Sequence, residues 1–355
     1  MRGLNHQIAN IFVIVKQESK MKSKAFKRVV IASALALVLA ACGDEKAKET
    51  AAASPAPAET TQSADKATQA PAAAKTVTIK HASGETVVPL KPEKVISFDF
   101  GMLDTLETLN VDVIGIPKAN MPSYLTKYEA DKYKNFGTLK EPNFEAIHAS
   151  KPDLIIISAR QAALYDQFAE IAPTINLTLD EADYMNSVSA NIKTLGEIFG
   201  QEGEVAKEVQ ALNDKVAKVR EQTAAMDERA LVMLVNDGKI SVYGPGSRFG
   251  IIHDVLGVKP ADTTIAQSRH GQTASFEYVM DLNPDYIFVV DRSAVVAGNG
   301  TTGAKAVVEN DLVKNTNAYK NGKIIYLDPN VWYLSGGGFK STNIMIDDVE
   351  KAIAK

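Results

Sequence analysis

The stretch FEYVMDLNPDYIFVVDR at residues 276–292 has a counterpart earlier in the chain, FEAIHASKPDLIIISAR at residues 144–160. Six of the seventeen positions are identical without a gap, and both copies end in arginine. In each copy an Asn or Ser that can cap a helix precedes Phe-Glu, and Pro-Asp then leads into an apolar run. Each copy therefore predicts a short helix, a turn and a buried strand, with Arg160 or Arg292 just past the strand.

Short apolar runs alternate with helical patterns through residues 76–355. Strands are expected at 94–98, 111–116, 153–158 and 174–179 in the first half, and at 230–235, 240–243, 285–290 and 323–327 in the second. Strands that alternate with helices imply parallel sheets with helices on their faces. The sequence thus predicts an α/β fold with two Rossmann-like lobes, each holding one copy of the repeat.

The segment EVAKEVQALNDKVAKVREQTAAM (204–226) separates the two copies. It contains no Gly or Pro, and its apolar residues recur at helical spacing, namely Val205, Val209, Leu212, Val216 and Val219. As one helix it would be about 34 Å long at 1.5 Å per residue. It could be an ordinary surface helix of one domain, but its place between the copies favours a connecting rod. We expect a backbone helix at 203–227 between an N-terminal lobe at 76–202 and a C-terminal lobe at 228–355.

The first 75 residues have a different character. Basic residues at 22–28 precede the apolar run VVIASALALVLA (29–40), which is too short to span a membrane and predicts a secretion signal at 1–41. Met21 begins a complete signal by itself, so we expect translation to start there. The run ends in LAAC (39–42), which resembles a bacterial lipoprotein signal and implies cleavage before Cys42 and lipidation of that residue. Residues 43–75 lack aromatic side chains and predict a disordered tether.

The charge of the exported chain limits its partners. Residues 1–41 hold seven of the 39 Lys and Arg and one of the 43 Asp and Glu, so their removal leaves 32 basic and 42 acidic residues and a formal charge of −10. An acidic protein of this kind is not expected to bind nucleic acid. A basic cluster within the folded part therefore needs a specific explanation.

Three arginines predict such a cluster. In open α/β sheets, ligands bind outside the carboxyl ends of the strands, so two facing lobes would direct Arg160 and Arg292 into one cleft. A third arginine, Arg248, lies in GPGSRFG (244–250), where a turn into a helix would offer backbone N–H groups and a positive dipole end to an anion. Each arginine alone could be a solvated surface residue. Their matching positions in the repeat favour a shared anion site.

Metal-binding and catalytic motifs are sparse. None of the five histidines forms a pair at metal-ligand spacing, and Cys42 is the only cysteine. No Ser/His/Asp order or pair of acids indicates an enzyme. We expect packing or surface roles for His148 and His253, whereas His270 stands in the polar loop SRHGQT (268–273) before the second repeat helix.

Taken together, the lipoprotein signal, the duplicated FE…PD…R pattern, the rod and the ending PNVWYLSGGG (329–338) resemble the ferric-siderophore-binding lipoproteins of ABC importers. These are class III periplasmic binding proteins, and the likeness is to the catecholate group that handles enterobactin-type and petrobactin-like ligands. It covers essentially all of residues 76–355. It implies an extracytoplasmic, membrane-anchored binding protein that has no catalytic activity and no intrinsic cofactor and whose ligand is an Fe(III)–siderophore complex. We expect a monomer.

The same resemblance assigns roles to residues. It implies that Arg160, Arg248 and Arg292 line the siderophore site, with Trp332 beside it. A tris-catecholate ferric complex carries about three negative charges, which guanidinium groups bind through charge-assisted hydrogen bonds. His270 and Tyr333 are implied to complete the coordination of the iron when a tetradentate siderophore leaves two positions open. Tyr333 could instead be an aromatic wall beside Trp332.

Glu145 and Glu277 form the second duplicated pair. Each is expected in the first turn of a helix, where an acidic side chain interacts favourably with the helix dipole. The family resemblance implies a further role, in which one acid on each lobe docks onto arginines of a permease dimer. The two roles are compatible.

Two alternatives remain open at the level of sequence. The same fold could carry haem, cobalamin or another iron chelate. A secreted α/β enzyme that acts on an anionic substrate is the second alternative, and turnover without binding of iron complexes would distinguish it.

Overall fold

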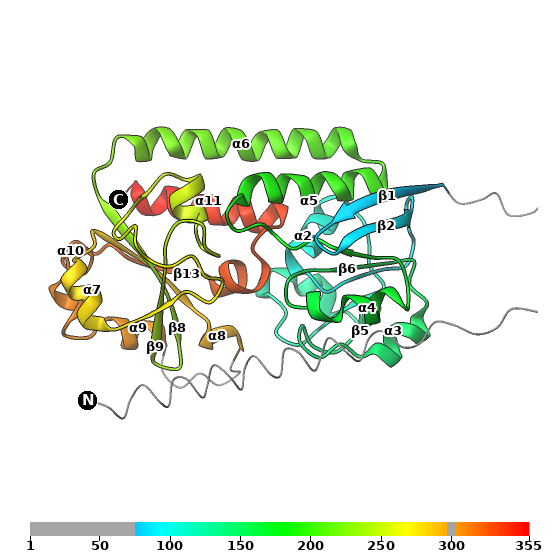
Figure 1. Cartoon of the computed structure of the whole chain (residues 1–355), viewed down its shortest axis with the longest axis horizontal. Coiled ribbons are helices and arrows are strands. Elements are labelled where there is room, and N and C mark those ends of the chain that lie inside the picture. The colour runs from blue at the N-terminus through cyan, green and yellow to red at the C-terminus, as the bar shows by residue number, and fades with distance from the viewer. Residues whose placement is uncertain (1–74, 297–302, 355) are drawn as a thin grey trace, which may run out of the picture. The chain divides into compact units, whose positions relative to one another are not determined.

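The computed structural model describes residues 75–296 and 303–354 (Figure 1). The expected signal at 1–41, the lipidation site Cys42 and nearly all of the tether at 42–75 lie outside the described residues. Within the described part, no helix combines the length and the apolar character needed to cross a membrane. This part begins with a hairpin of two antiparallel strands, β1 (Thr76–His81) and β2 (Gly84–Pro89).

The first half is built around a five-stranded parallel sheet of order β5-β4-β3-β6-β7. Consecutive residues of strand β6, next to the central strand, pack into different hydrophobic clusters, Leu154 and Ile156 on one face and Ile155 and Ile157 on the other. Both faces of the sheet are therefore buried, as a parallel sheet requires. The strands are β3 (Val95–Ser97), β4 (Gly115–Ile116), β5 (Lys134–Asn135), β6 (Leu154–Ile157) and β7 (Thr174–Asn176). The helices are α2 (Phe100–Thr108), η1 (Ser123–Glu129), α3 (Phe144–Ser150), η2 (Ala162–Leu164), α4 (Tyr165–Ala169) and α5 (Tyr184–Phe199).

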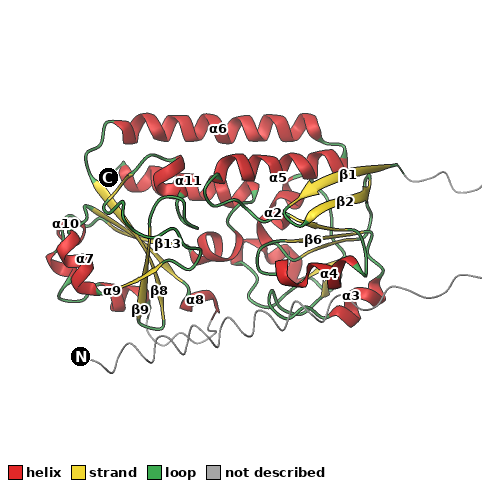
Figure 2. Cartoon of the chain, viewed as in Figure 1, coloured by secondary structure: helices red, strands yellow, loops and turns green. Residues whose placement is uncertain are grey.

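The second half contains a six-stranded sheet, whose order is β11-β9-β8-β12-β13 with β10 paired to β8. Figure 2 shows it in yellow on the side of the view opposite the first sheet. The strands are β8 (Arg229–Asn236), β9 (Lys239–Tyr243), β10 (Lys259–Pro260), β11 (Gln272–Ala274), β12 (Tyr286–Asp291) and β13 (Ile324–Leu327). The helices are η3 (Ile251–Val255), α7 (Phe276–Leu282), α8 (Ser293–Val296), α9 (Ala304–Val308), η4 (Val313–Asn315), α10 (Asn317–Lys320), η5 (Asn330–Ser335) and α11 (Phe339–Ile353).

The expectation of parallel strands is wrong for part of this second sheet. Strands β8, β12 and β13 are parallel, but β9 runs antiparallel to β8, and β11 runs antiparallel to β9. The cause is the two-residue turn Asp237-Gly238, in which both residues have positive φ, 49° and 75°. Such a turn matches the twist of a hairpin, and Asp-Gly is among the pairs that favour it. The sequence therefore did contain the signal for this hairpin.

Both copies of the repeat fold as the pattern predicts, into a capped helix, a turn and a buried strand. The Asn143 side chain accepts a hydrogen bond from the backbone N–H of Ala146 at 3.0 Å, at the start of α3. The Ser275 hydroxyl does the same for Tyr278 at 3.3 Å, at the start of α7. A left-handed residue ends each helix just before Pro-Asp, and β6 or β12 follows.

The aspartate of each Pro-Asp pair has the same structural role in both copies of the repeat. The carboxylate of Asp153 accepts a hydrogen bond from the backbone N–H of Lys94 at 2.8 Å, just before the neighbouring strand β3. Asp285 accepts one from the N–H of Arg229 at 3.0 Å, at the start of β8. Each aspartate thus ties its own strand to the beginning of the strand beside it.

A 23-residue helix, α6 (Glu202–Ala224), joins the two halves and lies along the top of the view in Figure 1. Near its start, Val205 packs against α5 of the first half. Near its end, the Thr223 hydroxyl donates to the carbonyl of Leu256 in the second half at 2.7 Å. Lys215 forms an ion pair with Asp347 of α11 at 2.6 Å. On these contacts we propose that residues 203–227 are the helix that connects an N-terminal lobe to a C-terminal lobe.

The C-terminal helix α11 returns to the first half, where it packs against α2. A Cβ atom at Gly338 would lie 2.0 Å from the carbonyl oxygen of Gly101, so the two backbones approach more closely than any other residue allows. Asp104, which is fully buried on α2, accepts hydrogen bonds from the backbone N–H groups of Lys340 and Ser341 at 3.1 and 3.0 Å. Residues 336–354 therefore fasten the two halves together, and we propose that α11 belongs structurally with the first.

The Asp104 carboxyl predicts a pH dependence of stability. Burial raises its pKa from 3.8 to about 7 and outweighs the hydrogen bonds that the carboxylate accepts, among them one from the Tyr124 hydroxyl at 3.0 Å. Because the folded state then holds the proton more tightly than the unfolded chain, this group costs stability as the pH rises from about 4 to 7, by up to about 4 kcal/mol. Asp104→Asn should remove this loss.

Urea unfolding of the protein and of Asp104→Asn at pH 5 and pH 8 measures the effect, because the other titrating groups are common to both proteins. The free energy of unfolding of the variant, relative to the unsubstituted protein, should be higher at pH 8 than at pH 5. An equal difference at the two pH values would show that Asp104 does not titrate in this range.

Candidate anion-binding site

Two adjoining cavities, of about 420 and 60 Å³, lie between the two halves. Arg160, Arg248, Arg269 and Tyr333 line both, so the cavities are neighbouring parts of one cleft. The larger cavity is also lined by His270 and Arg292. Five of the residues predicted for the site, the three arginines, His270 and Tyr333, therefore meet at one cavity.

The three arginines reach this cavity from three different elements. Arg160 lies in the turn after β6, and Arg292 directly follows β12, as the repeat predicted. Arg248 lies in the turn after β9, which reaches the cavity although β9 runs opposite to its neighbour. The carboxyl ends of the two repeat strands thus face one cleft, as open α/β sheets place their ligand sites.

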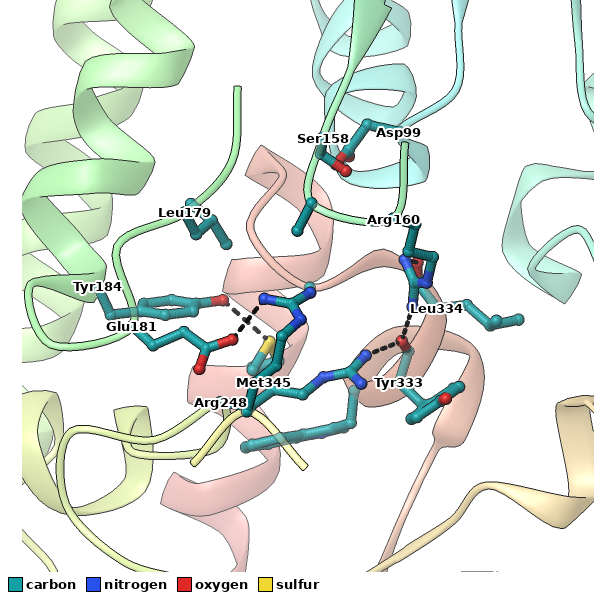
Figure 3. Close-up of a pocket in the computed structure, with 14 residues that line it drawn as sticks. Asp99, Ser158, Arg160, Leu179, Glu181, Tyr184, Arg248, Tyr333, Leu334 and Met345 are labelled. Carbon is teal, nitrogen blue, oxygen red and sulfur yellow. Dashed lines mark hydrogen bonds and ion pairs between the residues drawn. The ribbon is translucent and has the colours of Figure 1, made fainter. Parts of the chain in front are cut away.

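Tyr333 is the centre of the arginine cluster, and it lies in the π-helical turn η5. The guanidinium of Arg248 is 4.2 Å from the centre of its ring, and those of Arg160 and Arg292 are each 5.7 Å away. Arg160 donates to the backbone carbonyl of Tyr333 at 2.6 Å, and Arg248 donates to the same oxygen (Figure 3). The Nε of Arg292 donates to the phenolic oxygen at 2.9 Å. Three cations therefore surround one aromatic side chain.

None of these three arginines forms an ion pair with a carboxylate of the described residues. Their partners are the carbonyl oxygens of Tyr333 and Leu334, the Tyr333 hydroxyl and the side-chain oxygen of Asn236. Burial, and then repulsion from Arg248, lowers the pKa of Arg160 to about 10. Burial also lowers the pKa of Arg248. The cluster therefore concentrates positive charge without a direct ion pair among the described residues, which suits an anionic ligand.

The same charges act on the Tyr333 hydroxyl. Burial works to raise its pKa, but the hydrogen bond from Arg292 and the charges of Arg248, Arg292 and Arg160 outweigh it and leave the pKa below the ordinary value of 10.0. A phenolate is therefore easier to form here than on the protein surface. Phenolate oxygen is a hard ligand, of the type that ferric iron accepts.

His270 lies in the loop between β10 and β11, where its side chain is exposed and lines the larger cavity. Its backbone N–H donates to the Ser268 hydroxyl at 3.2 Å. Within the described residues, no group of three or more His, Cys, Asp or Glu could hold a metal ion. A metal that enters this cleft would therefore have to bring most of its ligands with it.

The glycine turn GPGSRFG (244–250) uses part of its backbone N–H groups for hydrogen bonds within the protein. Its free backbone N–H groups were expected to bind an anion, but the N–H of Gly246 donates to Asp254 at 2.6 Å and that of Gly250 donates to the carbonyl of Ser247 at 2.8 Å. The helix that follows, η3, has only five residues. Two backbone donors of the turn are therefore already used within the protein, and of residues 244–250 only Arg248 lines the cavity.

Three further cations line the cleft and have no clear signal in the sequence. Arg269 precedes His270, Lys239 begins β9, and Lys140 lies before α3. None belongs to the repeat or to a recognisable motif. Lys239 could have been found from the Asp237-Gly238 turn, because the hairpin brings its first residue back beside the end of β8.

Trp332, Glu145 and Glu277 lie outside the arginine cluster. Trp332 borders the smaller cavity, but it is only 2% exposed, and its indole N–H donates to Asp348 of α11 at 2.9 Å. Glu145 and Glu277 are exposed in the first turns of α3 and α7. Hydrogen bonds to its own backbone N–H and to Ser275 lower the pKa of Glu277, in agreement with a capping role.

Several known proteins are similar to this chain in both sequence and fold. The chain is 44% identical over 336 residues to the petrobactin-binding protein YclQ of Bacillus subtilis, covering 94% of this chain and all of that protein. It is 36% identical to the ferric-anguibactin-binding protein FatB of Vibrio anguillarum, over 78% of this chain and 87% of that one. The crystal structure of YclQ superposes with a TM-score of 0.77 and 48% identity over 79% of this chain and 99% of that one. The crystal structure of the catecholate-siderophore-binding protein VctP of Vibrio cholerae superposes with a TM-score of 0.74 and 35% sequence identity. The match covers 78% of this chain and 100% of that one.

These relatives are binding proteins and not enzymes. The sequence model of the periplasmic binding proteins matches residues 101–331, which include both copies of the repeat, α6 and the arginine cluster. With its two α/β halves, its connecting helix and its cleft, the chain belongs to the periplasmic binding protein family.

Proposed function

We propose that this protein captures a ferric catecholate-type siderophore in the cleft and delivers it to an ABC importer. The observation that carries the proposal is the arrangement of Arg160, Arg248 and Arg292 around Tyr333 without a carboxylate partner among the described residues. A tris-catecholate ferric complex carries about three negative charges on its outer oxygens, which match three guanidinium groups in charge and in hydrogen-bonding geometry. Relatives named for petrobactin, anguibactin and catecholate siderophores support the same ligand class.

Direct ligation of the iron is the finer part of the proposal. A tetradentate siderophore leaves two coordination positions of ferric iron open, and His270 and Tyr333 line the same cavity. The lowered pKa of Tyr333 favours its phenolate, and imidazole is a suitable second ligand. The two side chains would then bind the metal while the arginines bind the siderophore.

We also propose that Glu145 and Glu277 dock onto arginines of a permease dimer. Both are exposed, and they occupy equivalent positions in the two copies of the repeat. A binding protein with two such acids suits a partner with twofold symmetry. A monomer anchored through a lipid on Cys42 would remain close to that permease, and the long α6 would limit the closure of the halves to small motions.

Competition among ligand classes tests the proposal. The protein is incubated with equal amounts of a ferric tris-catecholate, a ferric trihydroxamate, haem and cobalamin, and native mass spectrometry identifies what remains bound after gel filtration. The catecholate should predominate. Retention of haem or cobalamin in its place would move the protein to another ligand class within the family.

Iron ligation has its own test, with a ferric complex of a tetradentate catecholate. Binding should shift the visible charge-transfer band of the complex, because a phenolate and an imidazole replace water on the iron. Tyr333→Phe and His270→Ala should remove this shift and weaken binding about tenfold or more. A shift that persists in both variants would leave the arginine cluster as the whole site.

A further inference from the structure

Arg269 and Glu181 form an ion pair between the two halves at the cleft. The Nη1 of Arg269 is 2.6 Å from the Oε1 of Glu181. Glu181 lies between β7 and α5 in the first half, and Arg269 lies between β10 and β11 in the second. Both line the smaller cavity, and Arg269 lines the larger one as well. The pair therefore crosses the cleft beside the arginine cluster.

This pairing distinguishes Arg269 from the other arginines that line the cleft. Arg160, Arg248 and Arg292 contact only uncharged partners among the described residues, whereas Arg269 has a carboxylate. The side chain of Glu181 is 19% exposed and that of Arg269 is 40% exposed, so solvent screens the pair only in part. An anion in the cleft would be attracted by the three arginines of the cluster, whereas Arg269 is held by Glu181 of the other half.

The pair also holds the loop that carries His270. Residues 261–271, here called the His270 loop, connect β10 to β11 without forming a helix or strand. Arg269 is adjacent to His270, and its bond to Glu181 ties the tip of the loop to the first half. If this bond opens, the tip of the loop is released from the first half, and the hydrogen bonds of Arg160 to the carbonyls of Tyr333 and Leu334 remain as contacts between the halves at the cleft.

We propose that Glu181 and Arg269 form a latch across the cleft that must open before the ligand leaves, so that the pair sets the residence time of the bound complex. This inference rests on the proposed function for its ligand. Glu181 would otherwise be a simple counterion whose removal frees Arg269 to attract the anion. The two roles predict opposite effects, because loss of a latch accelerates dissociation, whereas loss of a counterion slows it.

Dissociation kinetics separate the two roles. Protein loaded with a ferric tris-catecholate is mixed with an excess of the gallium complex of the same ligand, which has the same charge, and the recovery of Trp332 fluorescence is followed. Glu181→Gln should dissociate about fivefold to tenfold faster. The double variant with Glu181→Arg and Arg269→Glu restores the pair with its charges exchanged and should return the rate to within about twofold of the original.

Glu197→Gln is the matched control, because Glu197 is an exposed acid on α5 that lines neither cavity. It should leave the dissociation rate unchanged. Slower or unchanged dissociation in Glu181→Gln, or no recovery in the exchanged pair, would overturn the latch.

Hydrogen exchange tests the latch without any ligand and so separates its failure from failure of the proposed function. Amide exchange in the His270 loop of the empty protein should be faster in Glu181→Gln and in Arg269→Gln, and near the original rate in the exchanged pair. Unchanged exchange in both single variants would contradict the latch, whatever complex the cleft binds.

Discussion

Replacing Arg248 by glutamine should weaken the binding of a ferric tris-catecholate about a hundredfold. Arg248 is the central member of the cluster, with its guanidinium 4.2 Å from the centre of the Tyr333 ring. Hydrogen bonds to charged groups contribute about 1.5–3 kcal/mol each, and about 1.4 kcal/mol corresponds to a factor of ten in affinity. Loss of the guanidinium removes both its hydrogen bonds to the ligand and its charge.

The same substitution should not lower the unfolding temperature of the empty protein. Burial lowers the pKa of Arg248, so its charge is held at a cost in the folded state, and that cost is relieved when the charge is removed. Calorimetry of Arg248→Gln without ligand measures this effect. Lys193→Gln is the control for net charge, because Lys193 is exposed on α5 and lines neither cavity. A large loss of stability in Arg248→Gln would mean that Arg248 supports the fold and is not reserved for the ligand.

Reversing the charges of Glu145 and Glu277 together should abolish uptake of the iron complex and leave its binding intact. Truncating one partner of a buried, charged interface pair costs about 2–5 kcal/mol, and reversal adds repulsion, so the double Glu→Arg variant should lose most of its affinity for the permease. Uptake of radioactive iron, measured beside ligand affinity in solution, separates docking from capture.

Glu204→Arg with Glu221→Arg gives the same change in charge on α6, which lies on the side of Figure 1 away from α3 and α7. This control should transport normally. Normal uptake by the Glu145 and Glu277 variant would reduce these residues to helix capping. Loss of ligand binding in that variant would instead show a change within the cleft.

Much of the fold could be predicted because the same helix–turn–strand pattern occurs in both halves of the sequence. Asn143 and Ser275 cap their helices, Asp153 and Asp285 anchor their strands, and the same geometry follows in both halves. Repetition turns a weak local pattern into a strong one. The placement of Arg160 and Arg292 at one cleft followed from strand polarity alone.

What could not be predicted depends on contacts that are distant in sequence. Asp104 and Lys340 are 236 residues apart, and the sequence near Asp104 does not indicate that its carboxylate accepts a hydrogen bond from the backbone N–H of Lys340 in α11. Glu181 and Arg269 likewise meet only through the approach of two loops. In the glycine turn at 244–250, Asp254, eight residues after Gly246, accepts a hydrogen bond from an N–H group that the sequence leaves free for an anion.

Titration of the purified protein with a ferric tris-catecholate, followed through Trp332, tests the central claim most directly. Trp332 is the only tryptophan and borders the smaller cavity, so a bound iron complex should quench its fluorescence. We predict a Kd below about 1 μM for this trianionic complex and binding at least about a hundredfold weaker for a neutral ferric trihydroxamate. Equal affinity for the two, or tighter binding of the neutral complex, would contradict a cleft whose arginines select an anionic ferric complex.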